Sequence, residues 1–238
     1  MSAGRKIHSL SQDWGTPRKY VDAVKEVFGG AVDLDPCSNK FSIVSARVEY
    51  HLPGHDGLKE SWDFPRIYVN QPYGIDHERG TSIKQWLYRC ALANRAHDSE
   101  VLALVPVATN TGHWKRYVFT KARAVCFLYD TRLRFLVNGK DGGKGAPMSC
   151  AMIYWGDRYE KFRDVFGKHG AVVNLTEMLT LHLHAGSNDA QPELISEFHR
   201  GENGSEMVLA EGAVEYGISK RPANHHGTQP GKRPLAKH

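Results

Sequence analysis

Long apolar runs and a signal-peptide core are both missing from this sequence. No apolar stretch approaches the ~18 residues that a membrane span requires. Residues 1–6 are polar and are not followed by the apolar segment of a secretory signal. We therefore expect a cytoplasmic protein that makes no contact with a membrane.

Paired metal-binding residues are also missing. No two of the four cysteines form a CxxC pair, the arrangement typical of zinc sites and redox centres. His51 and His55 are four residues apart, but Pro53 and Gly54 exclude a helix that would present them together. We expect reduced thiols and no metal. The cysteines are Cys37, Cys90, Cys126 and Cys150.

The composition is that of a folded, globular protein. Of the 238 residues, 41% are hydrophobic and 24% are charged, which excludes a wholly disordered or fibrous chain. The length suits one α/β domain with an appendage. The formal net charge is +5, and residues 1–183 hold the excess, with 25 basic against 19 acidic side chains. This charge permits a polyanionic partner without requiring one.

Polarity divides the chain into three parts, and no internal repeat is visible. Residues 1–12 have little periodicity and predict a flexible arm. Residues 13–183 alternate helical and strand patterns and form the predicted domain. Residues 184–238 are polar and predict a largely flexible tail.

The pattern of the domain predicts an α/β fold. A helix over 17–28 begins with a Thr16 hydroxyl cap and Pro17 at its first position, and ends at Gly29 and Gly30. Further strands and helices alternate, which favours a mostly parallel central sheet with helices on its faces. The other predicted helices cover 81–97 and 111–119, and the strands cover 31–35, 66–70, 101–105, 123–128, 133–137 and 150–155.

Two of these strands end in polar residues followed closely by proline. Asp35 precedes Pro36, and Asn70 lies two residues before Pro72. Ligands of parallel sheets bind at the carboxyl ends of the strands. Asp35 and Asn70 are therefore candidate site residues.

The segment Asn70-Gln71-Pro72-Tyr73 resembles the Asn/Asp-Pro-Pro-Tyr motif of S-adenosylmethionine-dependent methyltransferases that modify an exocyclic or amide nitrogen. Such an amine is a poor nucleophile because its lone pair is delocalised. An Asn side-chain oxygen and the next main-chain carbonyl can accept both amine hydrogens, and a Tyr ring can stack on the base. A plain strand end with a proline turn explains the same four residues.

The flanking segments extend the resemblance over about residues 13–156, to the phage-type (Dam-like) DNA N6-adenine methyltransferase family. This resemblance implies a Rossmann-like fold, S-adenosylmethionine as cofactor, and DNA as partner. It also implies a phage or prophage origin and a bacterial or infected cell, in the setting of restriction and modification. The segments are Trp14-Gly15-Thr16-Pro17, Asp33-Leu34-Asp35-Pro36-Cys37, Asp56-Gly57-Leu58, Leu104 to Thr111, and Ala146-Pro147.

The resemblance also assigns roles to individual residues. Asn70, the Gln71 carbonyl and Tyr73, with Pro72 in the turn, would hold a flipped-out adenine for transfer to N6. Asp56 would accept the amine of the cofactor's adenine, although an ordinary Asp-Gly turn fits too. The residues implied for the methionine end of the cofactor are Trp14, Thr16, Pro17, Asp35, Pro36 and Cys37. A loop Asp that caps a turn is the alternative for Asp35.

Two departures from the family pattern leave alternatives open. The usual glycine-rich loop is missing, because Cys37 is followed by Ser38-Asn39-Lys40. Gln71 replaces a proline that would fix the backbone angle φ, and this loosens the loop. A cytosine N4 methyltransferase and a catalytically degenerate nucleic-acid-binding module therefore stay as alternatives. The sequence indicates neither the recognised DNA site nor the oligomeric state.

Overall fold

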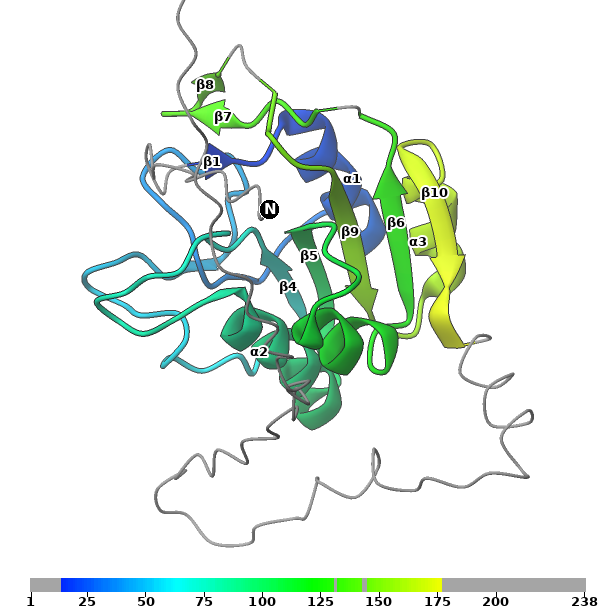
Figure 1. Cartoon of the computed structure of the whole chain (residues 1–238), viewed down its shortest axis with the longest axis horizontal. Helices are drawn as coiled ribbons and strands as arrows, with labels where there is room; N and C mark the ends of the chain where they lie inside the picture. The colour runs from blue at the N-terminus through cyan, green and yellow to red at the C-terminus, as the bar shows by residue number, and fades with distance from the viewer. Residues whose placement is uncertain (1–13, 131, 143–144, 177–238) are drawn as a thin grey trace, which may run out of the picture. The chain divides into compact units, whose positions relative to one another are not determined.

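A computed structural model describes residues 14–130, 132–142 and 145–176 of the chain. The arm predicted over 1–12 and the tail predicted over 184–238 lie outside these described residues. The described residues form a seven-stranded sheet with helices on both faces (Figure 1). Within these ranges, no helix combines the length and apolarity that crossing a membrane demands.

The strand order in the sheet is β10-β6-β9-β5-β4-β2-β3. Strands β2 to β6 run in one direction, whereas β9 and β10 run in the opposite one. Five of the seven strands thus run in one direction, as expected of a mostly parallel sheet, while three of the six pairings are antiparallel and make the sheet mixed. The strands are β2 (Leu34–Asp35), β3 (Val48–Glu49), β4 (Arg66–Val69), β5 (Glu100–Pro106), β6 (Ala124–Leu128), β9 (Cys150–Trp155) and β10 (Gly170–Asn174).

The antiparallel half arises from a return connection without a crossover. After β6, the chain forms a hairpin of β7 (Leu136–Val137) and β8 (Lys140–Asp141), then re-enters the sheet as β9 between β5 and β6. A strand parallel to β6 would need a crossover connection that brings the chain back to the end of the sheet where β6 begins. The hairpin instead joins β1 (Trp14–Gly15) in a separate three-stranded sheet, order β1-β7-β8.

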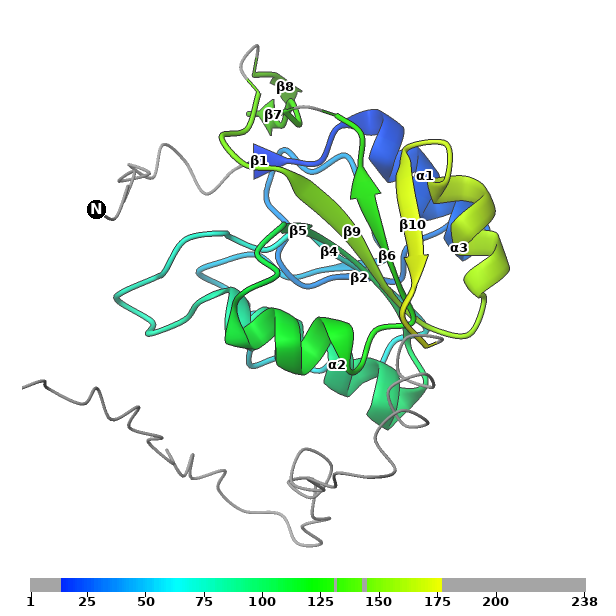
Figure 2. The ribbon, with the colours of Figure 1, turned by 45° about the vertical axis from the view of Figure 1, so that its right-hand side comes forward.

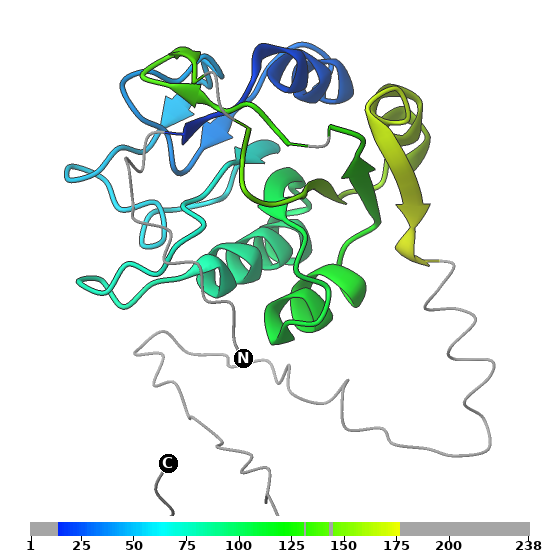
Figure 3. The ribbon, with the colours of Figure 1, turned by 45° about the horizontal axis from the view of Figure 1, so that its top comes forward.

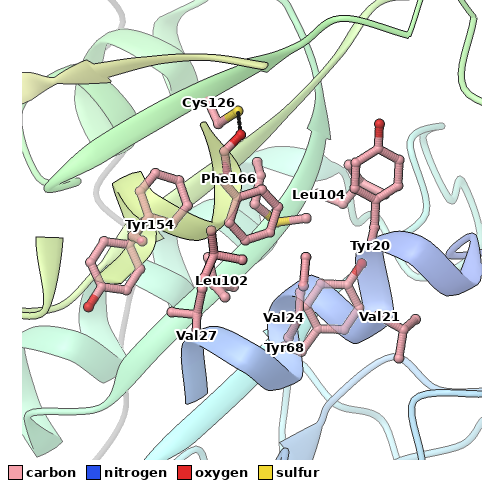
Figure 4. Packing of buried hydrophobic residues seen from close by; sticks show 14 of the residues in the cluster. Tyr20, Val21, Val24, Val27, Tyr68, Leu102, Leu104, Cys126, Tyr154 and Phe166 are labelled. Carbon is pink, nitrogen blue, oxygen red and sulfur yellow. Dashed lines mark hydrogen bonds between the residues drawn. The ribbon is translucent and has the colours of Figure 1, made fainter. Parts of the chain in front are cut away.

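Helices cover both faces of the main sheet (Figure 2). Alternate residues of β5 point to opposite faces, so Leu102 and Leu104 join one core while Val101, Ala103 and Val105 join the other. The first core packs against α1 (Arg18–Phe28) and α3 (Tyr159–Phe166), and Figure 4 shows Tyr20, Val24 and Phe166 within it. The second packs against α2 (Ile83–His97) and the π-helical η1 (Trp114–Phe119).

The first predicted helix is confirmed, but its predicted cap is wrong. Helix α1 starts at Arg18 with Pro17 at the N-cap, and Gly29 ends it in the left-handed region at φ 78°. The Thr16 hydroxyl does not cap the helix. It lies 2.7 Å from the Tyr68 hydroxyl, in a buried hydrogen bond between the chain before α1 and strand β4.

A partly buried ion pair at the amino end of the short strand β2 fixes its register. The Arg66 guanidinium donates to both Asp33 carboxylate oxygens, at 2.6 and 3.1 Å, and to the Phe28 carbonyl at 3.1 Å. The Asp33 side chain is only 5% exposed, and this pairing lowers its pKa. Leu34 consequently stands beside Ile67 of β4.

The main sheet continues past residue 156, where the resemblance ends, through α3 and β10, which we did not predict. Leu175, after β10, is buried in the second core. We therefore predict that a chain ending at residue 183 keeps the melting temperature of the full chain. A chain ending at residue 157 is the control, because it loses the buried Phe162 and Phe166 and should not fold cooperatively. A melting temperature lowered by several degrees in the longer truncation would contradict the predicted domain boundary.

Candidate active site

The candidate site lies where the direction of the chain across the sheet changes. From β2 the chain moves outward to β3, then returns to the other side of β2 as β4 and continues to β5. Such a switch point leaves a crevice beyond the carboxyl ends of the two central strands. Asp35 ends β2 and Asn70 follows β4, so both residues lie at this crevice.

A small cavity there brings together three segments that are distant in sequence. Its lining includes Trp14 and Thr16, Asp35 and Cys37, and Asn70 and Pro72. Six predicted site residues thus meet in one place. Pro17 lies outside this lining and borders a separate cavity beside Lys19.

The Asn70 side chain has a fixed orientation. Its Nδ2 donates to the Trp14 carbonyl at 2.8 Å, and because a carbonyl can only accept, the amide nitrogen must face Trp14. Its Oδ1 accepts from the Tyr73 hydroxyl at 3.3 Å. An amide oxygen has two lone pairs, so Oδ1 retains acceptor capacity beyond the bond to Tyr73.

The Gln71 side chain ties its loop to the sheet through a contact that the sequence analysis did not predict. The residue is 2% exposed, and its Nε2 donates to the Leu104 carbonyl of β5 at 3.3 Å. The β4–β5 ladder ends at the pair Val69 and Ala103, so the Leu104 carbonyl lies just beyond that ladder. Among the described residues, the Gln71 Oε1 is buried without a hydrogen-bond partner.

The Tyr73 hydroxyl points into the protein. It lies 3.3 Å from the same Leu104 carbonyl as well as from Asn70 Oδ1, and burial raises its pKa. The ring meets the edge of Phe135 at a centroid distance of 5.8 Å. Phe135 also stacks on Trp14 at 5.3 Å, so one aromatic side chain links the Asn70 loop to β1.

Asp35 is a buried carboxyl group, 5% exposed, whose Oδ1 accepts the Cys37 N–H at 3.2 Å. Desolvation raises its pKa to about 7, and the nearby Glu49 carboxylate adds to the shift. Glu49 pairs with Asp35 across β2 and β3, a neighbour that the sequence analysis missed. The one signal for this neighbour in the sequence was the charged residue Glu49 at the end of the short strand β3. A carboxyl poised near neutral pH in a crevice marks a functional-site candidate.

A larger cavity of about 280 Å³ adjoins the first and shares Cys37, Ser38, Asn39 and Pro72 in its lining. Pro36 also lines it. Its volume is close to the lower end of the range for small-molecule sites, ~300–1,000 Å³. The two cavities together therefore provide an elongated binding region along the carboxyl edge of β2.

Asp56 borders this region through its neighbour Gly57, which lines the larger cavity. A side chain at Gly57 would collide with the Pro36 carbonyl, because a Cβ there would lie 1.7 Å from that oxygen. The glycine thus brings the Asp56 turn against Pro36, in the segment that follows β2. Asp56 Oδ1 already accepts from the Leu58 N–H and from Arg79, both at 3.1 Å.

Comparison with known proteins identifies the family. The family described as DNA N-6-adenine-methyltransferase (Dam) matches residues 5–182, three quarters of the chain. A search of curated proteins found no match. The match spans every described segment that forms the two cavities, and the chain belongs to the DNA N-6-adenine-methyltransferase (Dam) family.

Proposed function

We propose that this protein transfers a methyl group from S-adenosylmethionine to the exocyclic N6 of a flipped-out adenine in DNA. Membership of the Dam family implies DNA adenine N6-methyltransferase activity. The observation that carries the finer proposal is the meeting of Asp35 and Asn70 at the switch point of the sheet. Helices on both faces of a sheet with this crevice also support a Rossmann-like fold.

The residues at the crevice fit a cationic cofactor. When bound, S-adenosylmethionine supplies an electrophilic methyl group on a positively charged sulfur. Asp35 would ionise against the positive charges of its methionine end, with Trp14 and Thr16 beside it. The larger cavity, bordered by the Asp56 turn, would receive the adenosine end. Asp56 Oδ2, 3.9 Å from the mostly exposed Lys59 ammonium, is the oxygen left to accept an adenine amine.

The Asn70 loop would hold the target amine. The remaining lone pair of Asn70 Oδ1 and the Gln71 carbonyl would accept its two hydrogens, favouring the pyramidal nitrogen that attacks the methyl group. Tyr73 would form a wall for the base, and Pro72 would shape the turn. The proton shed after transfer can pass to solvent, so the site needs no strong base.

Two alternatives stay open. Cytosine N4 poses the same chemical problem as adenine N6. A binding module that lost catalysis through Gln71 is the other, although the bond from Gln71 to Leu104 supports a working loop. The phage origin and the role in restriction and modification stay predictions.

Asp35→Asn should stabilise the folded protein while weakening cofactor binding. The pKa of Asp35 rises from 3.8 to about 7 on folding, so the parent loses stability as the pH rises through this range. The neutral variant escapes this loss and should gain up to about 4 kcal/mol relative to the parent at pH 8. Denaturant unfolding at pH 5 and pH 8 measures the difference. If the difference in unfolding free energy between variant and parent is the same at pH 5 and pH 8, the pKa of Asp35 is not raised on folding.

The same residue predicts the pH dependence of cofactor binding. Because ionised Asp35 would attract the cation, the affinity of the parent for S-adenosylmethionine should rise as the pH increases through 7. Asp35→Asn should bind at least tenfold more weakly at pH 8 and lack this rise. Calorimetric titration at several pH values checks both. Equal affinities of parent and variant would remove Asp35 from the cofactor site.

Asn70→Ala should reduce methyl transfer to DNA by ~10²–10³-fold, because it removes one preorganised acceptor. The variant also frees the Trp14 carbonyl, so cofactor affinity and melting temperature are measured alongside. We expect a folded protein that still binds S-adenosylmethionine. Near-normal turnover in such a protein would contradict the role of Asn70.

Gln71→Pro and Gln71→Ala form a matched pair. Proline would fix φ of the loop, and so the variant should hold or raise the rate of methyl transfer. Alanine supplies neither the proline ring that fixes φ nor the hydrogen bond to Leu104, so the alanine variant should transfer the methyl group more slowly than the parent. A proline variant slower than the alanine variant would show that the native loop needs a different backbone angle.

A further inference from the structure

We infer that Ile75 is the wedge that enters the base stack of DNA when the target base leaves it, an inference that rests on the proposed function. Flipping a base costs a few kcal/mol in lost stacking and pairing. DNA-deforming proteins commonly offset such costs by inserting an apolar side chain between bases. An exposed apolar residue near Asn70 is what this mechanism requires.

Ile75 meets this requirement by its exposure and its place in the chain. Its side chain is 66% exposed, and among the large hydrophobic residues of the described ranges only Tyr129 is more exposed. It lies two residues after Tyr73, whose hydroxyl is anchored at Leu104, and the exposed Gly74 separates the two. The extruded base would enter beside Tyr73, so an adjacent side chain is placed to fill the gap it leaves.

The loop that carries Ile75 is braced rather than loose. Asp76 and Thr81 exchange two backbone hydrogen bonds, at 2.9 and 3.1 Å. The Asp76 carboxylate accepts the backbone N–H groups of Glu78 and Arg79, at 3.1 and 3.0 Å, and the Arg79 Nε at 2.8 Å. Arg79 also reaches Asp56 at 3.1 Å, which ties the loop to the edge of the larger cavity.

This bracing suits insertion into DNA. Figures 2 and 3 show the loop between β4 and α2 projecting away from the sheet. A loop already held in shape loses little conformational freedom on binding. The β-branched side chain of isoleucine is itself stiff, because its first side-chain torsion has few allowed values. Ile75 is thus an exposed, stiff apolar side chain next to a braced segment of the loop that projects from the sheet.

The test compares two synthetic duplexes that carry one mapped target adenine. In the first, the adenine is paired with thymine; in the second, it faces an abasic site and is already unpaired. Ile75→Ala should lower kcat/KM roughly tenfold or more on the paired duplex and much less on the abasic one. Ile75→Met keeps an apolar wedge and should restore most of the activity on the paired duplex.

Two comparison variants isolate the effect. Tyr129→Ala removes a side chain that is 71% exposed but lies far from the Asn70 loop. Tyr129 follows β6, and two strands, β9 and β5, separate β6 from β4. This variant should therefore leave the ratio of kcat/KM on the two duplexes unchanged. Asn70→Ala should slow both duplexes equally. An Ile75→Ala variant that matches the parent on the paired duplex, or that slows both duplexes equally, would overturn the inference.

A second measurement separates the wedge from the reaction. With 2-aminopurine at the target position, extrusion of the base raises its fluorescence without any methyl transfer. The parent should produce this rise, and Ile75→Ala should reduce it. A parent that raises the fluorescence but transfers no methyl group would refute the proposed function alone. A parent and an Ile75→Ala variant with equal rises would refute the wedge alone.

Discussion

The site depends on the pairing of β2 with β4, two short strands that are held in register by the partly buried bonds of Arg66 to Asp33. The Arg66 side chain is 25% exposed, and Arg47 approaches the same Asp33 carboxylate at 3.4 Å, so two arginines hold this carboxylate in place. The pair of Arg66 and Asp33 lies at the amino end of β2. At the carboxyl ends, the same register brings Asp35 beside the Asn70 loop.

Two main-chain carbonyls hold the rest of the crevice together. Where the β4–β5 ladder ends, the Leu104 carbonyl accepts from Gln71 and lies within reach of the Tyr73 hydroxyl. The Trp14 carbonyl in β1 accepts from Asn70. The motif residues thus complete the backbone hydrogen bonding of the sheet and of β1. The antiparallel return through β7 adds Phe135, which packs between Trp14 and Tyr73.

Much of this was predictable from local pattern. The helix over 17–28, the strands ending at Asp35 and Asn70, and the convergence of these two residues all follow from periodicity and from the rule for strand ends. The hairpin turn at Asn138 and Gly139 has the positive φ values that this residue pair favours. The family resemblance also predicted Trp14 and Thr16 as site residues, and both line the same cavity.

Contacts between distant residues were not predictable. Thr16 looked like a helix cap, but Tyr68, 52 positions away, offered its hydroxyl a buried partner. Asp56 looked like a free acceptor, and its bond to Arg79 depends on how two loops meet. The bond of the Gln71 side chain to the Leu104 carbonyl was not foreseen, because strand order determines which carbonyl this side chain can reach.

The central claim concerns one bond, between a methyl group and N6 of adenine. Incubation of unmethylated DNA with the full chain and methyl-labelled S-adenosylmethionine, followed by digestion and separation of the nucleosides, tests it directly. The account predicts that the label is recovered in N6-methyladenine. Label in N4-methylcytosine, or DNA without label in the presence of a folded protein that binds it, would contradict the account.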